Sequence, residues 1–140
     1  MTPVEALQAI AARLEAEWSA TPVTYDAMRF DPPADAACVR GTMRDLPTRK
    51  VTHGNAGARQ ATRAALLIAQ VFAPIGEVDS SHPALELAEQ FRALFEGRDV
   101  PDTPGAECIN FEDATVRRIG ADGGFYQVNV NLTHTYPQTF

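Results

Sequence analysis

Hydrophobic residues near the start of the chain recur every three or four positions, the spacing of a helix that buries one face. The stripe consists of Leu7, Ile10, Leu14 and Trp18. Thr2, Pro3 and Glu5 precede it and match a capping box with a proline in the first turn. The pattern predicts a helix over Pro3–Trp18. The same spacing predicts a second helix from near Ser81 to Gly97, with its aromatic residues in the core together with Trp18.

Apolar and polar residues alternate in other parts of the chain, as they do in a strand with one buried face. The clearest case is Phe125–Tyr136, which at about 3.3 Å per residue would cross a compact domain of this size or project from it. Thr62–Phe72 is apolar on both sides and predicts a central strand. Further strands are expected at Val23–Tyr25, Ala37–Arg44, Cys108–Phe111 and Ala114–Ile119.

Proline, glycine and asparagine mark the segments between these strands. They predict a loop at Arg29–Asp35 and a long flexible hairpin tip over Asp45–Gln60. The elements together indicate one α+β domain over residues 1–140, with a mixed, mainly antiparallel sheet of about four to six strands. We expect two helices packed on one face of this sheet and a long β-hairpin.

The composition mainly excludes certain classes of protein. The 140 residues are 45% hydrophobic and 21% charged, which is typical of a globular domain. A membrane span and a secretory leader are not expected, because there is neither an 18-residue apolar run nor a charged leader. The net charge of −6 disfavours a protein that binds nucleic acid by neutralising phosphates.

The charge is unevenly distributed along the sequence. Residues 37–63 hold six basic residues against one carboxylate, a net charge of +5, which leaves −11 for the rest of the chain. The six are Arg40, Arg44, Arg49, Lys50, Arg59 and Arg63. Such a stretch is usually a solvated hairpin, but it can also be a surface for an acidic partner or a second copy of the chain.

The sequence offers no catalytic constellation, and we predict no catalytic, cofactor-binding or metal-binding residues. His53, His82 and His134 lack metal-ligand spacing, and Cys38 and Cys108 are expected to be small buried residues. The glycines match no nucleotide-binding pattern. The adjacent carboxylates at residues 112 and 113 would point to opposite faces of a strand, so we expect a turn or a solvated edge there.

Five stretches in order resemble the tail terminator (tail completion) proteins of long-tailed bacteriophages and related gene transfer agents. They are Pro3–Trp18, Thr24–Pro33, Leu66–Gly76, Ala84–Arg98 and Phe125–Tyr136. The resemblance implies a structural protein without enzymatic activity that forms a hexameric ring on the last ring of the tail tube. Such a ring stops tube polymerisation and offers a surface to the neck proteins of the head.

The resemblance also implies partners and a location: other copies of the chain, the tail tube protein and a neck or head-completion protein. The protein would be assembled in the bacterial cytoplasm and lie at the junction of tail and neck. An acidic ring would let DNA pass without binding it. Under this hypothesis the six basic residues form contacts with neighbouring subunits or with the tail tube.

Two alternatives remain open at this point. One is a different head–tail connector, such as a neck or head-closure protein. The other is a small α+β enzyme or ligand-binding module with a polar pocket under the sheet involving His134 or Tyr136.

Overall fold

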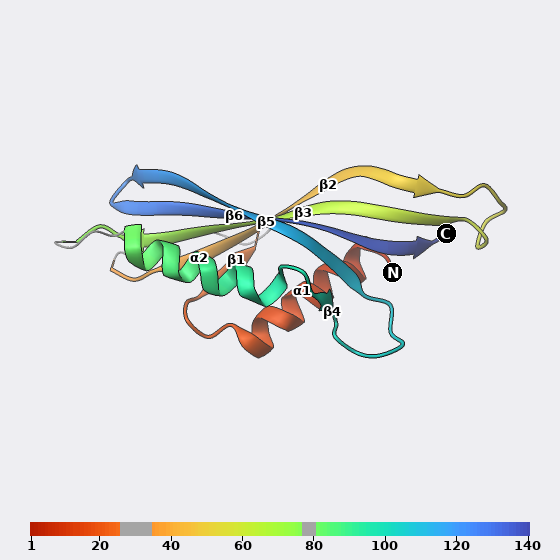
Figure 1. Cartoon of the computed structure of the whole chain (residues 1–140), viewed down its shortest axis with the longest axis horizontal. Helices are drawn as coiled ribbons and strands as arrows, with labels where there is room; N and C mark the ends of the chain where they lie inside the picture. Colours follow the sequence, from red (N-terminus) through yellow and green to blue (C-terminus); the bar gives the residue numbers. More distant parts are fainter. Residues whose placement is uncertain (26–34, 77–80) are drawn as a thin grey trace.

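The computed structural model describes residues 1–25, 35–76 and 81–140, and these form a six-stranded mixed sheet with two helices on one face (Figure 1). The strand order is β1-β2-β3-β6-β5-β4; β1 runs parallel to β2, and the other neighbours are antiparallel. This arrangement confirms the α+β class and the predicted sheet. The elements are α1 (Pro3–Glu17), β1 (Val23–Tyr25), β2 (Cys38–Val51), β3 (Gln60–Pro74), α2 (Ser81–Phe95), β4 (Asp99–Val100), β5 (Ile109–Asp122) and β6 (Phe125–Thr139).

The capping box at the start of α1 is confirmed. The Thr2 hydroxyl oxygen lies 3.2 Å from the Glu5 N–H, and the Thr2 N–H donates to the Glu5 carboxylate at 2.6 Å. The buried side of the helix, however, is narrower than predicted. Ala6, Ile10 and Leu14 are buried, whereas 46% of Leu7 is exposed. Leu7 therefore belongs to the rim of the helix and not to its core stripe.

A row of aromatic rings runs through the core from the end of α1 to β6. Trp18 meets Phe91 with ring centroids 5.4 Å apart, and Phe91 meets Phe95 at the same distance. Phe95 lies 4.9 Å from Phe111, and the row continues through the imidazole of His134 to Tyr136 on β6. The predicted core positions of Trp18, Phe91 and Phe95 are confirmed.

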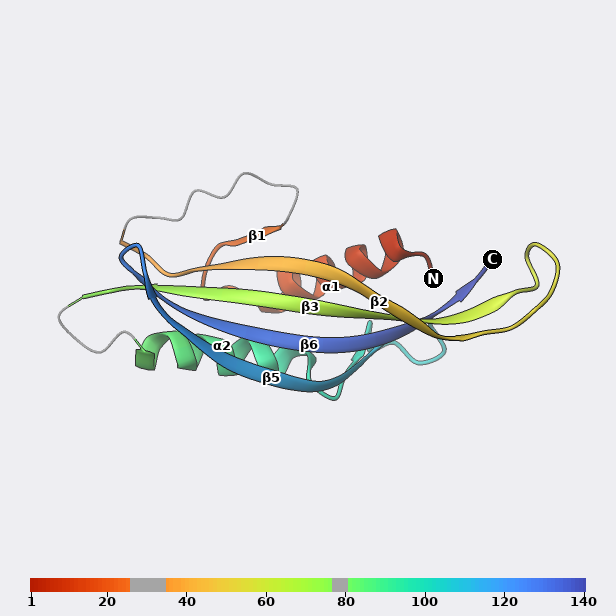
Figure 2. The same cartoon turned by 90° about the horizontal axis from the view of Figure 1, so that it is seen from above.

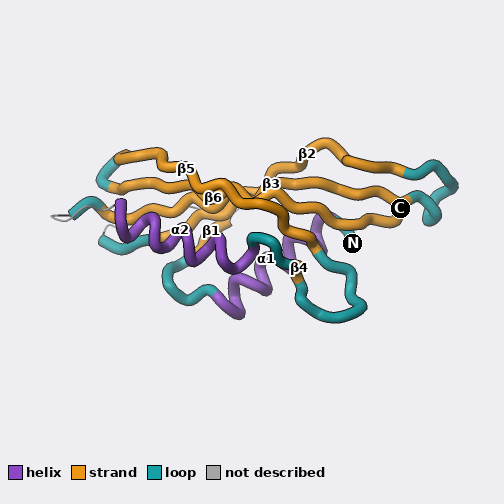
Figure 3. The backbone as a smooth tube through the Cα atoms, viewed as in Figure 1, coloured by secondary structure: helices purple, strands orange, loops and turns teal. Residues whose placement is uncertain are grey.

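The strands are longer than predicted. The hairpin of β2 and β3 continues to Val51 and Gln60, so the prediction of a flexible tip over Asp45–Gln60 is wrong for half of that segment, residues 45–51 and 60. Backbone pairing with β3 holds this part extended, and only residues 52–59 form the tip. Figures 2 and 3 show β2 and β3 projecting past the helices at this end, with the C-terminal part of β6 beside them.

Other differences are smaller. The two strands predicted between Cys108 and Ile119 are one strand, β5, with a register shift between Phe111 and Ala114 that inserts one extra residue. The short strand β4 was not predicted. Thr62–Phe72 is central, as expected. Of the predicted loop Arg29–Asp35, all but Asp35 lies outside the described residues.

Candidate interaction surface

The six basic residues predicted to bind a partner lie along β2 and β3, spread from the middle of the sheet to its projecting end. Arg40 is half-buried and lies opposite Thr24 and Gln70, whereas Arg59 ends the tip loop. The structure thus does not gather the six into one cluster. We call residues 44–63 the basic hairpin; it holds five of them, Arg44, Arg49, Lys50, Arg59 and Arg63.

Arg49 binds within its own chain. Its guanidinium forms a two-pronged contact with Glu112, in which Nη1 donates to Oε1 and Nη2 lies 3.1 Å from Oε2. The hydrogen bonds and the charge of Glu112 raise the pKa of Arg49. Because β3 and β6 lie between β2 and β5 in the sheet, this side chain ties the basic hairpin to the insertion in β5 across two strands. The predicted solvated edge at residues 112 and 113 is therefore an anchoring point of the hairpin.

Arg59 and Arg63 are engaged with the C-terminus. Both guanidinium groups lie over the ring of Phe140, at 4.6 Å and 5.0 Å from its centroid. The backbone of Phe140 exchanges two hydrogen bonds with that of Arg59, at 2.9 Å and 3.2 Å. Arg63 also donates to Gln138 and Thr48, each at 2.7 Å. These contacts brace the hairpin against the end of β6.

Arg44 and Lys50, unlike the other basic residues of the hairpin, have side chains that are not engaged within the described chain. Both are exposed, and neither makes an ion pair or side-chain hydrogen bond with any residue in the described ranges. Val51, next to Lys50, is 50% exposed although it is a large apolar residue. The projecting strand therefore presents two cations and an apolar side chain to solvent.

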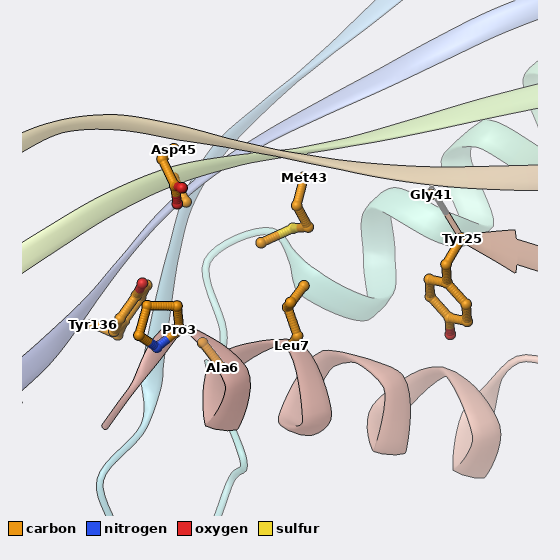
Figure 4. Close-up of a pocket in the computed structure, with 9 residues that line it drawn as sticks. Pro3, Ala6, Leu7, Tyr25, Gly41, Met43, Asp45 and Tyr136 are labelled. Atoms are coloured by element: carbon orange, nitrogen blue, oxygen red, sulfur yellow. The ribbon is translucent and has the colours of Figure 1, made fainter. Parts of the chain in front are cut away.

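An apolar groove of about 370 Å³ lies beside the base of this hairpin, between α1 and β2 (Figure 4). Leu7 points from α1 toward Met43 of β2, and Tyr25 of β1 stands at one end of the groove. Tyr136 and Pro3 lie side by side at the other end, with Asp45 across the groove from them on β2. Ala6, Gly41 and Ala65 complete the lining.

The polar groups of the groove are a carboxylate and two phenols. Asp45 is exposed and makes no ion pair with a described residue. Burial raises the pKa of Tyr136, and the charge of Asp45 raises it further. Burial likewise raises the pKa of Tyr25, with a contribution from Glu15 of α1. The groove is therefore apolar along its length, with negative charge near both ends.

Sequence reasoning missed this groove. The signal that could have found it is the excess of apolar residues on α1: Val4 is 61% exposed, and Leu7 lies off the buried stripe. A narrower stripe of Ala6, Ile10 and Leu14 would have left both side chains without a place in the core.

Neither the histidines nor the cysteines of the described residues form a metal site. No group of three or more His, Cys, Asp or Glu side chains in the described ranges could hold a metal ion. Both cysteines are free; Cys38 is buried as predicted, whereas Cys108 is only half-buried. No helix in the part of the chain that is described is long and apolar enough to cross a membrane.

His134 is the one polar or charged residue in the described part of the core. Its Nδ1 lies 3.3 Å from the carbonyl oxygen of Leu132, and its Nε2 has no hydrogen-bond partner among the described residues. Burial lowers its pKa, and the nearby charges of Asp45 and Glu112 oppose this only in part. His134 does not line the groove, so of the two residues proposed for a ligand pocket only Tyr136 reaches it.

Comparison with known proteins identifies a fold but no family. No family model matches the sequence, and no curated protein matches it. A solved structure whose name states no function is similar at a TM-score of 0.66 and 19% identity, over 96% of both chains. A chain from the virion of a native gene transfer agent particle is similar at a TM-score of 0.48 and 17% identity, over 96% of this chain and 97% of that one. At 19% identity the first similarity shows a shared fold alone, and the second supports no conclusion.

Proposed function

We propose that the chain is a structural virion protein, without enzymatic activity, that forms a ring on the end of a tail tube. In this role it stops tube polymerisation and offers the attachment surface for a neck or head-completion protein. The observation that carries the proposal is the basic hairpin, a braced projection from an acidic chain that presents Arg44, Lys50 and Val51 to solvent. A projection of this kind suits contact with an acidic neighbour, because opposite charges favour and orient association.

The resemblance of five stretches to tail terminator proteins supports the same role. Apart from residues 26–33, those stretches lie in described parts of the chain, where they form both helices, one central strand and the closing strand. The charge is compatible with a conduit for DNA. Six copies at −6 each would carry a formal charge of about −36, which repels the phosphates of a passing duplex.

Electron microscopy of the purified protein, alone and mixed with tail tubes of its own particle, tests this proposal. We expect a ring on one end of each tube and no further growth of capped tubes when tube protein is added. Light scattering after size exclusion should give hexamers or concentration-dependent assembly. A chain that neither decorates tube ends nor blocks their growth contradicts the proposal.

Charge reversal tests which residues make the contact. The double variant Arg44→Glu/Lys50→Glu should stay folded and lose most of its association, because both side chains are exposed and bind nothing else in the described chain. Arg49 and Arg59 are left unchanged, since they brace the hairpin itself. Arg117→Glu/Arg118→Glu is the matched control, with the same change in charge at two exposed positions on β5. Equal loss in both double variants would indicate a general charge effect and contradict a specific role for the hairpin.

A further inference from the structure

We propose that the groove between α1 and β2 receives the basic hairpin of a second copy of the chain, with Lys50 of one copy against Asp45 of the next. This inference rests on the proposed function, because it names the contact that would build the ring. In this contact the groove of one copy binds the exposed end of the hairpin of the next copy.

The residues that line the groove indicate which kind of side chains would bind in it. Its walls are apolar, and one of the residues that line it, Leu7, is 46% exposed. Asp45 at one end supplies a carboxylate with no ion-pair partner in the described chain, and Glu15 adds negative charge near the other end. A matching occupant therefore carries an apolar side chain next to a cation.

The described chain carries this combination on its own projecting hairpin. Large apolar side chains are exposed at six described positions, namely Val4, Leu7, Leu46, Val51, Ile75 and Ile119. Leu7 lines the groove itself, and Val4 lies one turn away from Leu7 on α1. Val51 directly follows Lys50 near the end of β2, the strand that extends past the helices (Figure 1). The two side chains point to opposite faces of the strand, and in the described chain β1 covers the edge of β2 only at residues 39–41. If the groove receives this edge, Lys50 lies against one wall and Val51 against the other. Ile119 also follows a cation, Arg118, but it lies on β5 at the opposite side of the sheet.

The contact has to join two copies. Lys50 and Asp45 lie on the same extended strand, five residues apart, which is roughly 16 Å of chain. The hairpin of one copy therefore meets the groove of another, and the two surfaces of each copy are different. A head-to-tail contact of this type forms a closed ring when the rotation between neighbours closes.

Two single charge reversals test the pairing. Asp45→Lys places a lysine against Lys50 of the neighbour, and Lys50→Asp places an aspartate against Asp45. Each variant alone should associate at least tenfold more weakly than the wild type, as measured by light scattering over a concentration series. Arg118→Asp makes the same change in charge as Lys50→Asp, beside the exposed Ile119, and should associate like the wild type.

Mixing the two variants distinguishes a specific pair from a general charge effect. In an equimolar mixture every hairpin can meet a groove of opposite charge, so association should return, and alternating copies can close only a ring with an even number of subunits. The double variant Asp45→Lys/Lys50→Asp should recover in the same way. The neutral variants Asp45→Asn and Lys50→Gln, which preserve more of the local packing, should weaken association less than the reversals, and circular dichroism should show that all variants are folded.

Several results would overturn the inference. They are single reversals that associate like the wild type, a mixture that shows no recovery, or a loss of association only in Arg118→Asp. A wild-type chain that stays monomeric at the highest attainable concentration but still caps tube ends would overturn the inference and leave the proposed function standing. Failure to cap tubes by a chain that forms rings through this contact would do the reverse.

Discussion

The β2–β3 hairpin has a covered half over the helices and a projecting half beyond the register shift between Leu46 and Lys50, and the two halves differ in what covers them. In the half above the helices, Val39, Ala69 and Val71 are fully buried. In the projecting half the ladder continues, yet Lys50 and Val51 face solvent. Pairing alone stabilises a strand pair only marginally in water, whereas a covered apolar face adds the main driving force. We therefore place most of the folding free energy in the covered half and treat the projecting half as a braced extension available for contacts.

Truncation of a side chain in the aromatic row should cause the largest loss of stability. Phe95 is fully buried between Phe91 and Phe111, so Phe95→Ala should lower the free energy of unfolding by about 3–5 kcal/mol. Val51→Ala is the control in the projecting half, where Val51 is 50% exposed, and should cost less than about 1 kcal/mol. Urea unfolding followed by circular dichroism measures both. Similar losses in the two variants would contradict the division of stability between the halves.

The difference between the covered and the projecting half explains which elements could be predicted from the sequence. Both helices, the central strand and the alternation in Phe125–Tyr136 were predictable because a covered face imposes a period on the residues that form it. The extension of β2 to Val51 was not, because a strand without a covered face needs no apolar alternation. Proline and glycine near the tip indicated a loop, while the ladder to β3 holds Leu46, Lys50 and Val51 in strand geometry.

The candidate site was predictable only in part. Proline, glycine and asparagine indicated the hairpin, and the excess of basic residues coincides with it, but charge counts do not show which cations are used inside the chain. Glu112 and Phe140, which engage Arg49, Arg59 and Arg63, are distant in sequence. The groove depends on the separation between α1 and β2, which no local pattern encodes. The local signal was the excess of apolar residues on α1, and Leu7 was assigned to the buried stripe of the helix.

His134 should give the next largest effect, and it lies where the covered core approaches the base of the hairpin. Burial holds its folded-state pKa below the ordinary value of 6.5, so the unfolded chain binds the proton more readily. Neutral His134 therefore makes its full contribution to the stability of the fold above about pH 6.5. This contribution decreases as the pH falls from about 6.5 to the folded-state pKa. We expect the free energy of unfolding to decrease over this window.

His134→Leu isolates this contribution. The variant keeps the site apolar and cannot be protonated, so its stability relative to the wild type should improve as the pH is lowered from 7 to 5. His53→Leu, at an exposed position in the hairpin tip, is the control and should follow the wild type. Denaturant titrations at several pH values provide the measurement. An equal pH dependence in the wild type and His134→Leu would mean that the acid sensitivity comes from other groups.

The smallest effect on stability should come from the ion pair that braces the projecting half. Arg49 and Glu112 are both accessible to solvent, and exposed ion pairs contribute little and are screened by salt. Arg49→Gln should therefore lower the melting temperature slightly at low ionic strength, and the difference should disappear near 1 M salt, where charges are screened beyond about 3 Å. Arg44→Gln on the same strand has no ion pair to lose within the described chain and should show no salt-dependent difference. A loss in Arg49→Gln that persists at high salt would mean that the guanidinium supports the hairpin by packing across β3 and β6 and not by charge, and the projecting half would then be more firmly held than its exposure suggests.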